Sequence, residues 1–418
     1  MFKLKIHWQI LIALALAVLF AVFFTDDVQY VTWMGDLFLR ALKMIIVPLI
    51  LTSIVSGVTN IGDAQNLGKL GFKTILYYVT TSLLAILIGL TLVNLFQPGV
   101  GADLGLRKEV EGLSAASGGI GNILLRMVPT NFFQALVSAD MLAIIFFAIL
   151  VGFFITKVSD EYKNPLVNLF NGGFEVMMKI TSFIIKFTPL GIFGIVAGVV
   201  AEQASDSAAL FDMVQRLGIY MLAVLLGLAI HAVITLPLIL RLFGKANPWA
   251  HFKAMTTPLL TAFSTSSSSA TLPLTLEAVE HNDGVSNKIT SFVLPLGATV
   301  NMDGTALYEC VAAMFIAQAY GVDLSFIQQV IVVFTALLAS IGAAGIPMAG
   351  LVMISVILSA VGLPLEGVGL ILAVDRILDM CRTSVNVWSD SCGAVVIAKT
   401  EGEILKVQLK ELVKSQIT

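Results

Sequence analysis

The sequence predicts an all-helical membrane protein. Of its 418 residues, 12% are charged and 58% are hydrophobic, and that charged share is about half of what soluble globular proteins carry. Apolar runs long enough to cross the hydrocarbon core of a bilayer, which is about 30 Å thick, recur along the chain. Because backbone polar groups must be satisfied internally in lipid, such runs are expected to form α-helices.

The first half of the chain predicts a series of spans. The first apolar run, 10–25, follows Lys3 and Lys5 and is long for a signal peptide. It also lacks a small-residue cleavage site, so we interpret it as a spanning helix. Further runs cover roughly 32–58, 70–96, 121–156, 166–200 and 209–243.

The distribution of Lys and Arg predicts that both termini are cytoplasmic. With that orientation the external segments are poor in bases, and only the loop at about 97–120 deviates, with Arg107 and Lys108. The cytoplasmic segments would carry Lys3, Lys5, Lys69, Lys73, Lys157, Lys163, Arg241, Lys245, Lys253, Lys288 and the four lysines of the tail.

Two segments of the second half predict helical hairpins. In 257–283 a serine run, Ser264–Ser269, separates two apolar arms, and in 327–361 the run Ser340–Pro347 does the same. Each arm is too short to cross a bilayer, so we expect re-entrant hairpins whose tips line a wet cavity. The alternatives are packing between helices through small residues at the first tip and a simple kink at the second.

A third polar interruption lies within the apolar run 289–320. The sequence Asn301–Thr305 contains Asn, Asp and Gly, which should unwind a helix there. Unwinding would expose carbonyl groups beside the carboxylate of Asp303, without a thiol or an imidazole. Such oxygen ligands suit a hard cation.

The most informative stretch is a polar stripe near the C-terminus. Asp375, Asp379, Arg382, Asn386 and Asp390 are spaced by four, three, four and four residues, which places them on one face of a helix. Ionisable groups within a membrane usually mark a pathway or a binding site. For Asp379 and Arg382, the alternative is an ion pair that only stabilises the fold. Counting Asp303, four carboxylates face one guanidinium, so protonation, bound cations or Arg376 must supply the missing charge.

The remaining chemistry-bearing residues argue against other classes of protein. Cys310, Cys381 and Cys392 fall in predicted membrane segments and lack metal-ligand spacing. The sequence contains no recognisable hydrolase or nucleotide-binding motif, so we do not expect an enzyme or a resident cofactor. The formal net charge of −3 gives no reason to expect nucleic acid as a partner.

Five motifs together resemble the glutamate transporter family, the dicarboxylate/amino acid:cation symporters, over nearly the whole chain, and in particular its prokaryotic sodium-coupled members. They are Val128–Asn131, the tip 265–269, Asn301–Thr305, Ser340–Pro347 and the stripe Asp375–Asp390.

The resemblance implies a homotrimer in the cell (inner) membrane, with eight transmembrane helices and two re-entrant hairpins per chain. It also implies an elevator mechanism, in which a moving core carries substrate past a scaffold. Scaffold helices 1–2 would occupy 1–70 and helix 3 with its outer loop 71–120. Scaffold helices 4–5 would follow at 121–205, the transport core at 206–400 and a cytoplasmic tail at 401–418.

The resemblance also implies roles in binding an acidic amino acid. Arg382 would grip the side-chain carboxylate in a bidentate manner, with Thr305 adding a hydroxyl, and Asp375 would orient the guanidinium. Asp379 would hold the α-ammonium, beside Thr383. The α-carboxylate would be bound by Asn386 and by hairpin-tip backbone N–H groups around Ser266, Ser267, Ser268, Ile346 and Gly350.

Two to three sodium ions, with three favoured, are implied as co-transported ligands. The first ion would bind Asp390 and the carbonyls of Gly297, Asn301 and Asn386. The second would bind carbonyls of Thr299, Ser340, Ile341 and Ala343 once the second hairpin closes. The third would bind Tyr78, Thr81 and Ser82 together with Asn301 and Asp303.

The choice of substrate and ion within the family depends on three residues. Arg382 favours acidic substrates, and the presence of both Asp303 and Asp390 favours sodium, because proton-coupled relatives usually replace the latter. Many relatives carry a second arginine at the position of Ser266 or Met380. Because this chain lacks it, the resemblance does not imply potassium counter-transport. A proton-coupled or dicarboxylate carrier and a channel stay open as alternatives, and the sequence does not separate aspartate from glutamate.

Overall fold

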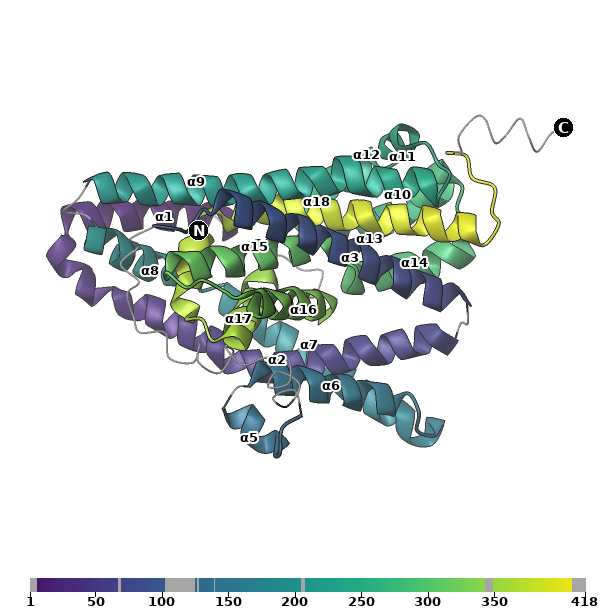
Figure 1. Ribbon diagram of the computed structural model, residues 1–418, viewed down its shortest axis with the longest axis horizontal. Helices are drawn as coiled ribbons and strands as arrows, with labels where there is room; N and C mark the ends of the chain where they lie inside the picture. The colour runs from purple at the N-terminus through teal and green to yellow at the C-terminus, as the bar shows by residue number, and fades with distance from the viewer. Residues whose placement is uncertain are drawn as a thin grey trace, which may run out of the picture.

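The described part of the chain is built from helices. The computed structural model describes residues 6–66, 69–101, 125, 128–138, 140–203, 207–342 and 349–407, and no β-strand occurs among them (Figure 1). This confirms the all-α class.

The first half forms long helices in the predicted order. Its regular elements are α1 (Ile6–Phe23), the 3₁₀ turn η1 (Thr25–Tyr30), α2 (Thr32–Asn66), α3 (Lys69–Phe96), α5 (Phe132–Val137), α6 (Met141–Ile155), α7 (Asp160–Ile185), α8 (Thr188–Gln203) and α9 (Ser207–Ile230). α9 continues through the π-helical turn η3 (His231–Thr235) into α10 (Leu236–Leu242). The predicted run 166–200 is two helices that meet at an angle of 54°.

The second half is more interrupted, as its sequence indicates. It contains α11 (Pro248–Ala254), α12 (Thr256–Thr265), α13 (Ser268–Ala278), the π turn η4 (Val279–Asp283), α14 (Asn287–Val300), α15 (Asp303–Ala319), α16 (Phe326–Gly342), α17 (Ala349–Val361), the 3₁₀ turn η5 (Leu365–Gly367) and α18 (Val368–Thr400).

By length and apolar composition, three helical stretches in the described residues can cross a membrane, or four if the bent pair α7–α8 counts as one span. The three are Thr25–Thr59, Lys69–Phe96 and Phe211–Leu242. The eight spans implied by the resemblance exceed this count. Several of the remaining helices are short or broken, and α18 carries the polar stripe along its length.

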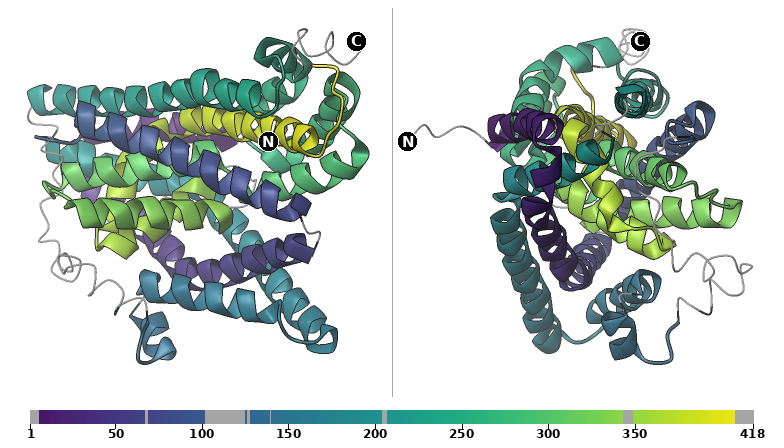
Figure 2. Two further views of the ribbon diagram at one scale, coloured as in Figure 1. Left: turned by 45° about the vertical axis from the view of Figure 1, so that its right-hand side comes forward. Right: turned by 90° about the vertical axis from the view of Figure 1, so that its left-hand side faces the viewer.

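The helices pack as two groups, one around α2 and one around α15. On one side α2 packs against α6, α7 and α8, and on the other α15 packs against α3, α9 and α18. In the end-on view of Figure 2 the purple and blue helices α2 and α5–α8 lie to one side of the green and yellow second half. The pair α16–α17 packs against both α15 and α2, whereas α12–α13 packs against α14 and α18. Nearly every residue of α15 is buried, which makes this helix the centre of the core.

Local sequence explains the two breaks that shape the second half. Ser266 ends α12 in the left-handed conformation, with φ of 52°, and Ser267 caps α13 by accepting a hydrogen bond from the amide of Ala270. The serine run therefore separates two helices, and their re-entrant course in the bilayer stays a prediction. α14 ends at Val300 and α15 begins at Asp303, so the predicted interruption at Asn301 is also confirmed. The tip of the second pair, 343–348, lies outside the described residues.

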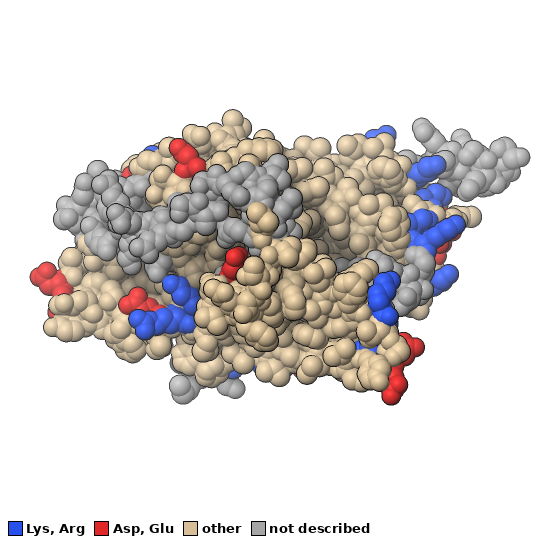
Figure 3. Space-filling view, turned by 60° about the horizontal axis from the view of Figure 1, so that its bottom comes forward, with Lys and Arg blue, Asp and Glu red and all other residues tan. Residues whose placement is uncertain are grey.

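Basic side chains gather at the end of the molecule where α3 begins and α18 ends (Figure 3). There the Nζ of Lys73 lies 2.6 Å from the carboxylate of Glu401, and the Nζ of Lys406 donates to the carbonyl of His281 at 2.7 Å. The hydrogen bond from Lys73 lowers the pKa of the Glu401 carboxyl below its ordinary value. The clustering agrees with the predicted cytoplasmic face, whose orientation stays a prediction.

Candidate functional site

The polar stripe of α18 points into the protein. Asp375, Asp379, Arg382, Asn386 and Asp390 each expose 3% or less of their surface. Burial of three carboxylates and a guanidinium along one helix is costly unless each is paired or hydrogen-bonded. Their partners outside α18 come from α14, α15, the break at Asn301 and the start of α17, so the stripe is the meeting line of the second-half helices.

Arg382 is held by two carboxylates and an aromatic ring. Its Nε and Nη2 lie 3.0 and 2.8 Å from Oδ1 of Asp379, and its Nη1 lies 3.3 Å from Oδ1 of Asp375. The guanidinium carbon lies 4.2 Å from the ring centre of Tyr308, whose hydroxyl donates to Asp375 at 2.5 Å. Arg376 also approaches Asp379, at 3.5 Å. The site therefore presents one cation and two carboxylates within reach of one another.

Two glycines bring backbone against this arginine. A Cβ atom on Gly350 would lie 2.7 Å from Nη1 of Arg382, and one on Gly304 would lie 2.5 Å from the Arg382 carbonyl oxygen. Both distances are shorter than real Cβ contacts, so a side chain at Gly304 would clash with backbone and one at Gly350 would displace the guanidinium. The start of α17 thus lies directly over the guanidinium.

Asn386 connects the stripe to the broken helix. Its Oδ1 accepts hydrogen bonds from the amides of Gly304 and Thr305, at 2.8 and 3.3 Å, and its Nδ2 donates to the Thr305 hydroxyl at 3.0 Å. These bonds satisfy amides at the start of α15 that have no partner within the helix. Thr383, one turn before, is also buried.

Asp390 lies against the end of α14. Its Oδ1 accepts a hydrogen bond from Nδ2 of Asn301 at 2.9 Å, and a Cβ on Gly297 would lie 2.6 Å from the same oxygen. A carboxylate, a side-chain amide and the last carbonyls of α14 meet here. Such an oxygen-rich cluster can bind a monovalent cation.

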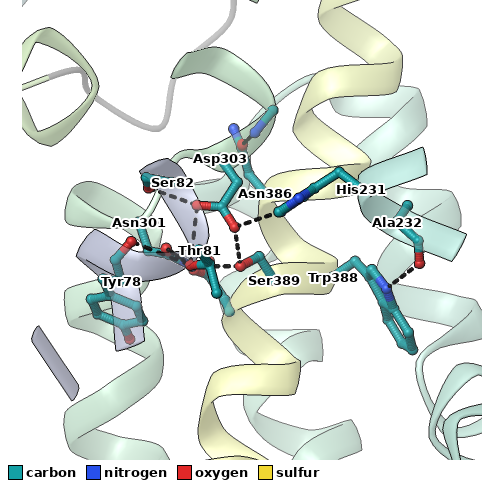
Figure 4. Close-up of polar contacts among 12 residues, drawn as sticks. Tyr78, Thr81, Ser82, His231, Ala232, Asn301, Asp303, Asn386, Trp388 and Ser389 are labelled. Atoms are coloured by element: carbon teal, nitrogen blue, oxygen red, sulfur yellow. Dashed lines mark hydrogen bonds and ion pairs between the residues drawn. The ribbon is translucent and has the colours of Figure 1, made fainter. Parts of the chain in front are cut away.

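A second oxygen cluster surrounds Asp303 (Figure 4). Its Oδ1 accepts from Ser82 at 2.6 Å and from Thr81 at 3.3 Å. Its Oδ2 accepts from the hydroxyl of Ser389 at 2.6 Å and lies 3.0 Å from Nε2 of His231. Thr81 also lies 3.3 Å from Oδ1 of Asn301, so the two clusters share that amide.

The other predicted sodium ligands do not all lie in these two clusters. The hydroxyl of Tyr78 donates to the carbonyl of Val293 at 2.6 Å and points toward Gly297 rather than Asp303. Thr299 is exposed, whereas Ser340 is buried with its hydroxyl on the carbonyl of Leu337. Ile341 contacts the position of Gly57 on α2. Ala343 and Ile346 lie outside the described residues.

The predicted serines of the first tip are buried. Ser266, Ser267 and Ser268 expose 8% or less of their surface. The hydroxyl of Ser266 has no hydrogen-bond partner among the described residues, so it is a free polar group at this turn.

The prediction missed two ionisable residues next to the stripe. His231 is fully buried in the π turn η3 and contacts Asp303, while Glu309 is fully buried in α15. Neither carboxylate oxygen of Glu309 has a hydrogen-bond partner within the described part of the chain. Both residues stand within predicted apolar runs, and that placement was the signal available in the sequence. π turns are also frequent at functional sites.

A separate buried cluster lies further along α18. Nδ1 of His251 lies 2.9 Å from Oδ2 of Asp283, and its Nε2 lies 3.1 Å from the hydroxyl of Ser391. The imidazole stacks on Trp388, with ring centres 4.7 Å apart. Although this order of groups is that of a hydrolytic triad, His251, Asp283 and Ser391 are all fully buried. We interpret the cluster as a polar anchor between α11, η4 and α18.

Comparison with known proteins identifies a single family. The model of the sodium:dicarboxylate symporter family matches residues 6–400. The proton/glutamate-aspartate symporter of Escherichia coli (strain K12) is 36% identical over 416 residues, covering 96% of this chain and 93% of that protein. The proton/sodium-glutamate symport protein of Geobacillus stearothermophilus is 35% identical, with 96% of each chain covered. The excitatory amino acid transporter 3 of Homo sapiens is 38% identical, with 88% of this chain and 79% of that protein covered.

Proposed function

The chain belongs to the sodium:dicarboxylate symporter family, and from that premise we propose that it takes up L-aspartate, L-glutamate or both by sodium symport. It is a membrane transporter and not an enzyme. The choice of acid and of coupling ion is the part that we propose.

The arrangement around Arg382 carries the substrate proposal. An acidic amino acid brings a side-chain carboxylate, which can take the place of a carboxylate on the guanidinium, and an ammonium group, which can pair with the released Asp379. The exchange keeps every buried charge paired, which is the condition for placing charges in a low-dielectric interior. Asp375 would stay on Arg382 throughout and hold its orientation.

The two oxygen clusters support sodium as the driving ion. We assign the first ion to Asp390, Asn301, Gly297 and Asn386, and a further ion to Asp303, Asn301, Thr81 and Ser82. The Tyr78 hydroxyl, which is bonded to the carbonyl of Val293, is not a ligand of that further ion in this conformation. A third would use Thr299, Ser340, Ile341 and Ala343 at the second hairpin. Three sodium ions under a tenfold gradient and a potential of about 100 mV would supply roughly 9 kcal/mol per substrate of charge −1.

We further propose an elevator movement in a homotrimer. α1, α2 and α6–α8 would form the scaffold, while α3 and α9–α18, including the two hairpins, would carry the substrate. The pair α16–α17 packs against α2, whereas α12–α13 packs on helices of the moving core. This packing supports a conformation in which the second hairpin is covered by the scaffold and the first is free to release substrate.

Proton coupling is the second candidate, and Glu309 favours it. A buried carboxylate without a hydrogen-bond partner is costly, so this group is expected to be held as the neutral acid. A proton carried on Glu309 would add to the sodium ions or replace one of them. Two of the relatives above are named as proton or proton/sodium symporters.

The deciding experiment is uptake of labelled L-aspartate into proteoliposomes under an inward sodium gradient or an inward proton gradient, each alone. We expect uptake with sodium alone, and a weakened sodium dependence in Asp390→Asn. Uptake with protons alone would contradict the sodium assignment, and a normal sodium titration in Asp390→Asn would contradict its role as a ligand.

A variant pair separates the two coupling candidates further. If Glu309 carries a proton, Glu309→Gln should abolish any acceleration of uptake by an inward proton gradient. Glu277→Gln, at an exposed position of α13, is the matched control and should leave that acceleration unchanged. Equal behaviour of the two variants would remove Glu309 from the mechanism.

A further inference from the structure

An apolar groove lies on the face of α18 that points away from the substrate site. It lies between η3–α10, α11, α12 and α18 and has a volume of about 630 Å³, within the range of roughly 300–1,000 Å³ typical of ligand pockets. Val233, Trp249 and Leu260, on three different walls, each expose more than half of their surface, so the groove is open. Trp388 of α18 also contributes to its walls.

The groove suits hydrocarbon rather than a polar ligand. Three polar side chains of its walls are already bonded within the chain. Nε1 of Trp388 donates to the carbonyl of Ala232 at 3.0 Å, as Figure 4 shows, and the Ser384 hydroxyl donates to the carbonyl of Met380 at 3.1 Å. The Thr256 hydroxyl donates to the carbonyl of Lys253 at 3.0 Å. A polar ligand would lose its hydration there without gaining hydrogen bonds.

One end of the groove is basic. Lys253 lies with its Nζ 5.6 Å from the ring centre of Trp249, which is a wall residue. Arg241 stands in the last turn of α10 and Lys245 follows that helix, and all three bases are exposed. Within the described ranges, no carboxylate forms an ion pair with any of the three. The groove entrance therefore carries uncompensated positive charge.

The helix at this entrance has the features of a membrane interface. α11 places Trp249 and Phe252 on one exposed face, with ring centres 5.5 Å apart, beside Lys253. Tryptophan and lysine gather at the level of lipid headgroups, since each has an apolar body and a polar end.

We propose that this groove binds one acyl chain of an anionic phospholipid, whose phosphate is held by Lys253 with Arg241 and Lys245 nearby. The ligand is distinct from the transported amino acid, so the proposal goes beyond the transport function. Because α12 is both a wall of the groove and the first arm of the hairpin, a bound lipid opposes separation of α12 from α18. The lipid would thus act on the hairpin from the face opposite the substrate.

Trp388 provides a direct probe, because bromine atoms on an acyl chain quench a nearby indole. The chain has four tryptophans, so the variant Trp8→Phe, Trp33→Phe, Trp249→Phe leaves Trp388 alone. It is reconstituted in phosphatidylcholine vesicles that contain a minority of lipid brominated in its acyl chains, either phosphatidylglycerol or phosphatidylcholine. We expect stronger quenching by brominated phosphatidylglycerol.

Two lysine variants test the headgroup contact. Lys253→Ala should reduce the preference for phosphatidylglycerol about fivefold, since one base near an anionic headgroup contributes about that much to binding. Lys288→Ala removes an exposed base of α14 that does not line the groove and should leave the preference unchanged.

Three outcomes would overturn the proposal. Equal quenching by the two brominated lipids would mean contact with bulk lipid only. No quenching by either would mean that the groove is closed or covered by another copy of the chain. Equal effects of Lys253→Ala and Lys288→Ala would remove the headgroup site. Should the triple Phe variant fail to fold, retention of phosphatidylglycerol by the unaltered chain and by Lys253→Ala, measured by native mass spectrometry, gives the same decision.

Discussion

Glycine at 297, 304 and 350 brings backbone against the charged side chains of α18. Each position would place a Cβ within 2.7 Å of an atom of Asp390 or Arg382. Because glycine has no side chain, it lets the backbone of α14, α15 and α17 approach the stripe closely. The binding groups of this site are therefore backbone as much as side chain.

Gly297→Ala is expected to weaken sodium binding. The added methyl group would lie 2.6 Å from Asp390 and 2.8 Å from the Tyr78 hydroxyl, so the carboxylate must move. We expect the sodium concentration for half-maximal aspartate binding to rise about tenfold or more, equivalent to about 1.4 kcal/mol. Gly218→Ala on α9, where a methyl group would meet nothing within 4 Å, is the control. An unchanged sodium titration in Gly297→Ala would contradict the first ion site.

Arg382→Lys should lose most of the affinity for acidic substrates, even though the charge is kept. A lysine ammonium cannot make the planar bidentate contact of a guanidinium, and one lost charged hydrogen bond costs about 1.5–3 kcal/mol. We expect aspartate binding to fall at least tenfold by isothermal titration calorimetry. Arg376→Lys, one and a half turns earlier and partly exposed, should change it little. Equal affinity of both variants would show that Arg382 does not bind the substrate.

At the scale of elements, α18 organises the second half by using its faces differently. One face presents Arg382 and Asp390 to α14, α15 and α17, and another presents Trp388 to the groove. Near its far end Ser391 joins the anchor of His251 and Asp283. The pair α12–α13 is thus held at its base by a buried polar cluster.

His251→Ala should destabilise the base of this hairpin. It would leave Asp283 buried without its partner, and breaking a buried polar pair from one side costs on the order of 3–5 kcal/mol. We expect a clear drop in the thermal unfolding midpoint of the purified protein. His281→Ala changes an exposed histidine of η4 and serves as the control. Equal midpoints for the two variants would mean that the cluster does not anchor the helices.

At the scale of the whole molecule, the contact between α2 and the second hairpin defines the conformation described above. A Cβ on Gly57 would lie 3.5 Å from Cγ2 of Ile341, so side chains at these two positions are direct neighbours. If the core moves past the scaffold, this contact must break during each transport cycle.

Gly57→Cys with Ile341→Cys, in a background without Cys310, Cys381 and Cys392, should therefore form a disulfide on oxidation. We expect the oxidised protein to lose aspartate uptake and to regain it on reduction, while each single-cysteine variant is unaffected by oxidant. Full uptake by the oxidised double variant would contradict a movement of the hairpin relative to α2.

The sequence by itself determined the features that depend on neighbouring residues. The break at Asn301, the helical pair around Ser266 and the shared face of Asp375 to Asp390 follow from turn propensities and helical periodicity. Only the tertiary structure decided the contacts between distant segments, such as His231 with Asp303, His251 with Asp283 and Tyr308 with Asp375. Glu309 stands in an apolar run, but only packing shows that its carboxylate lacks a partner. The physical reason is that local spacing sets which face a residue occupies, whereas its neighbour across that face depends on how separate helices pack.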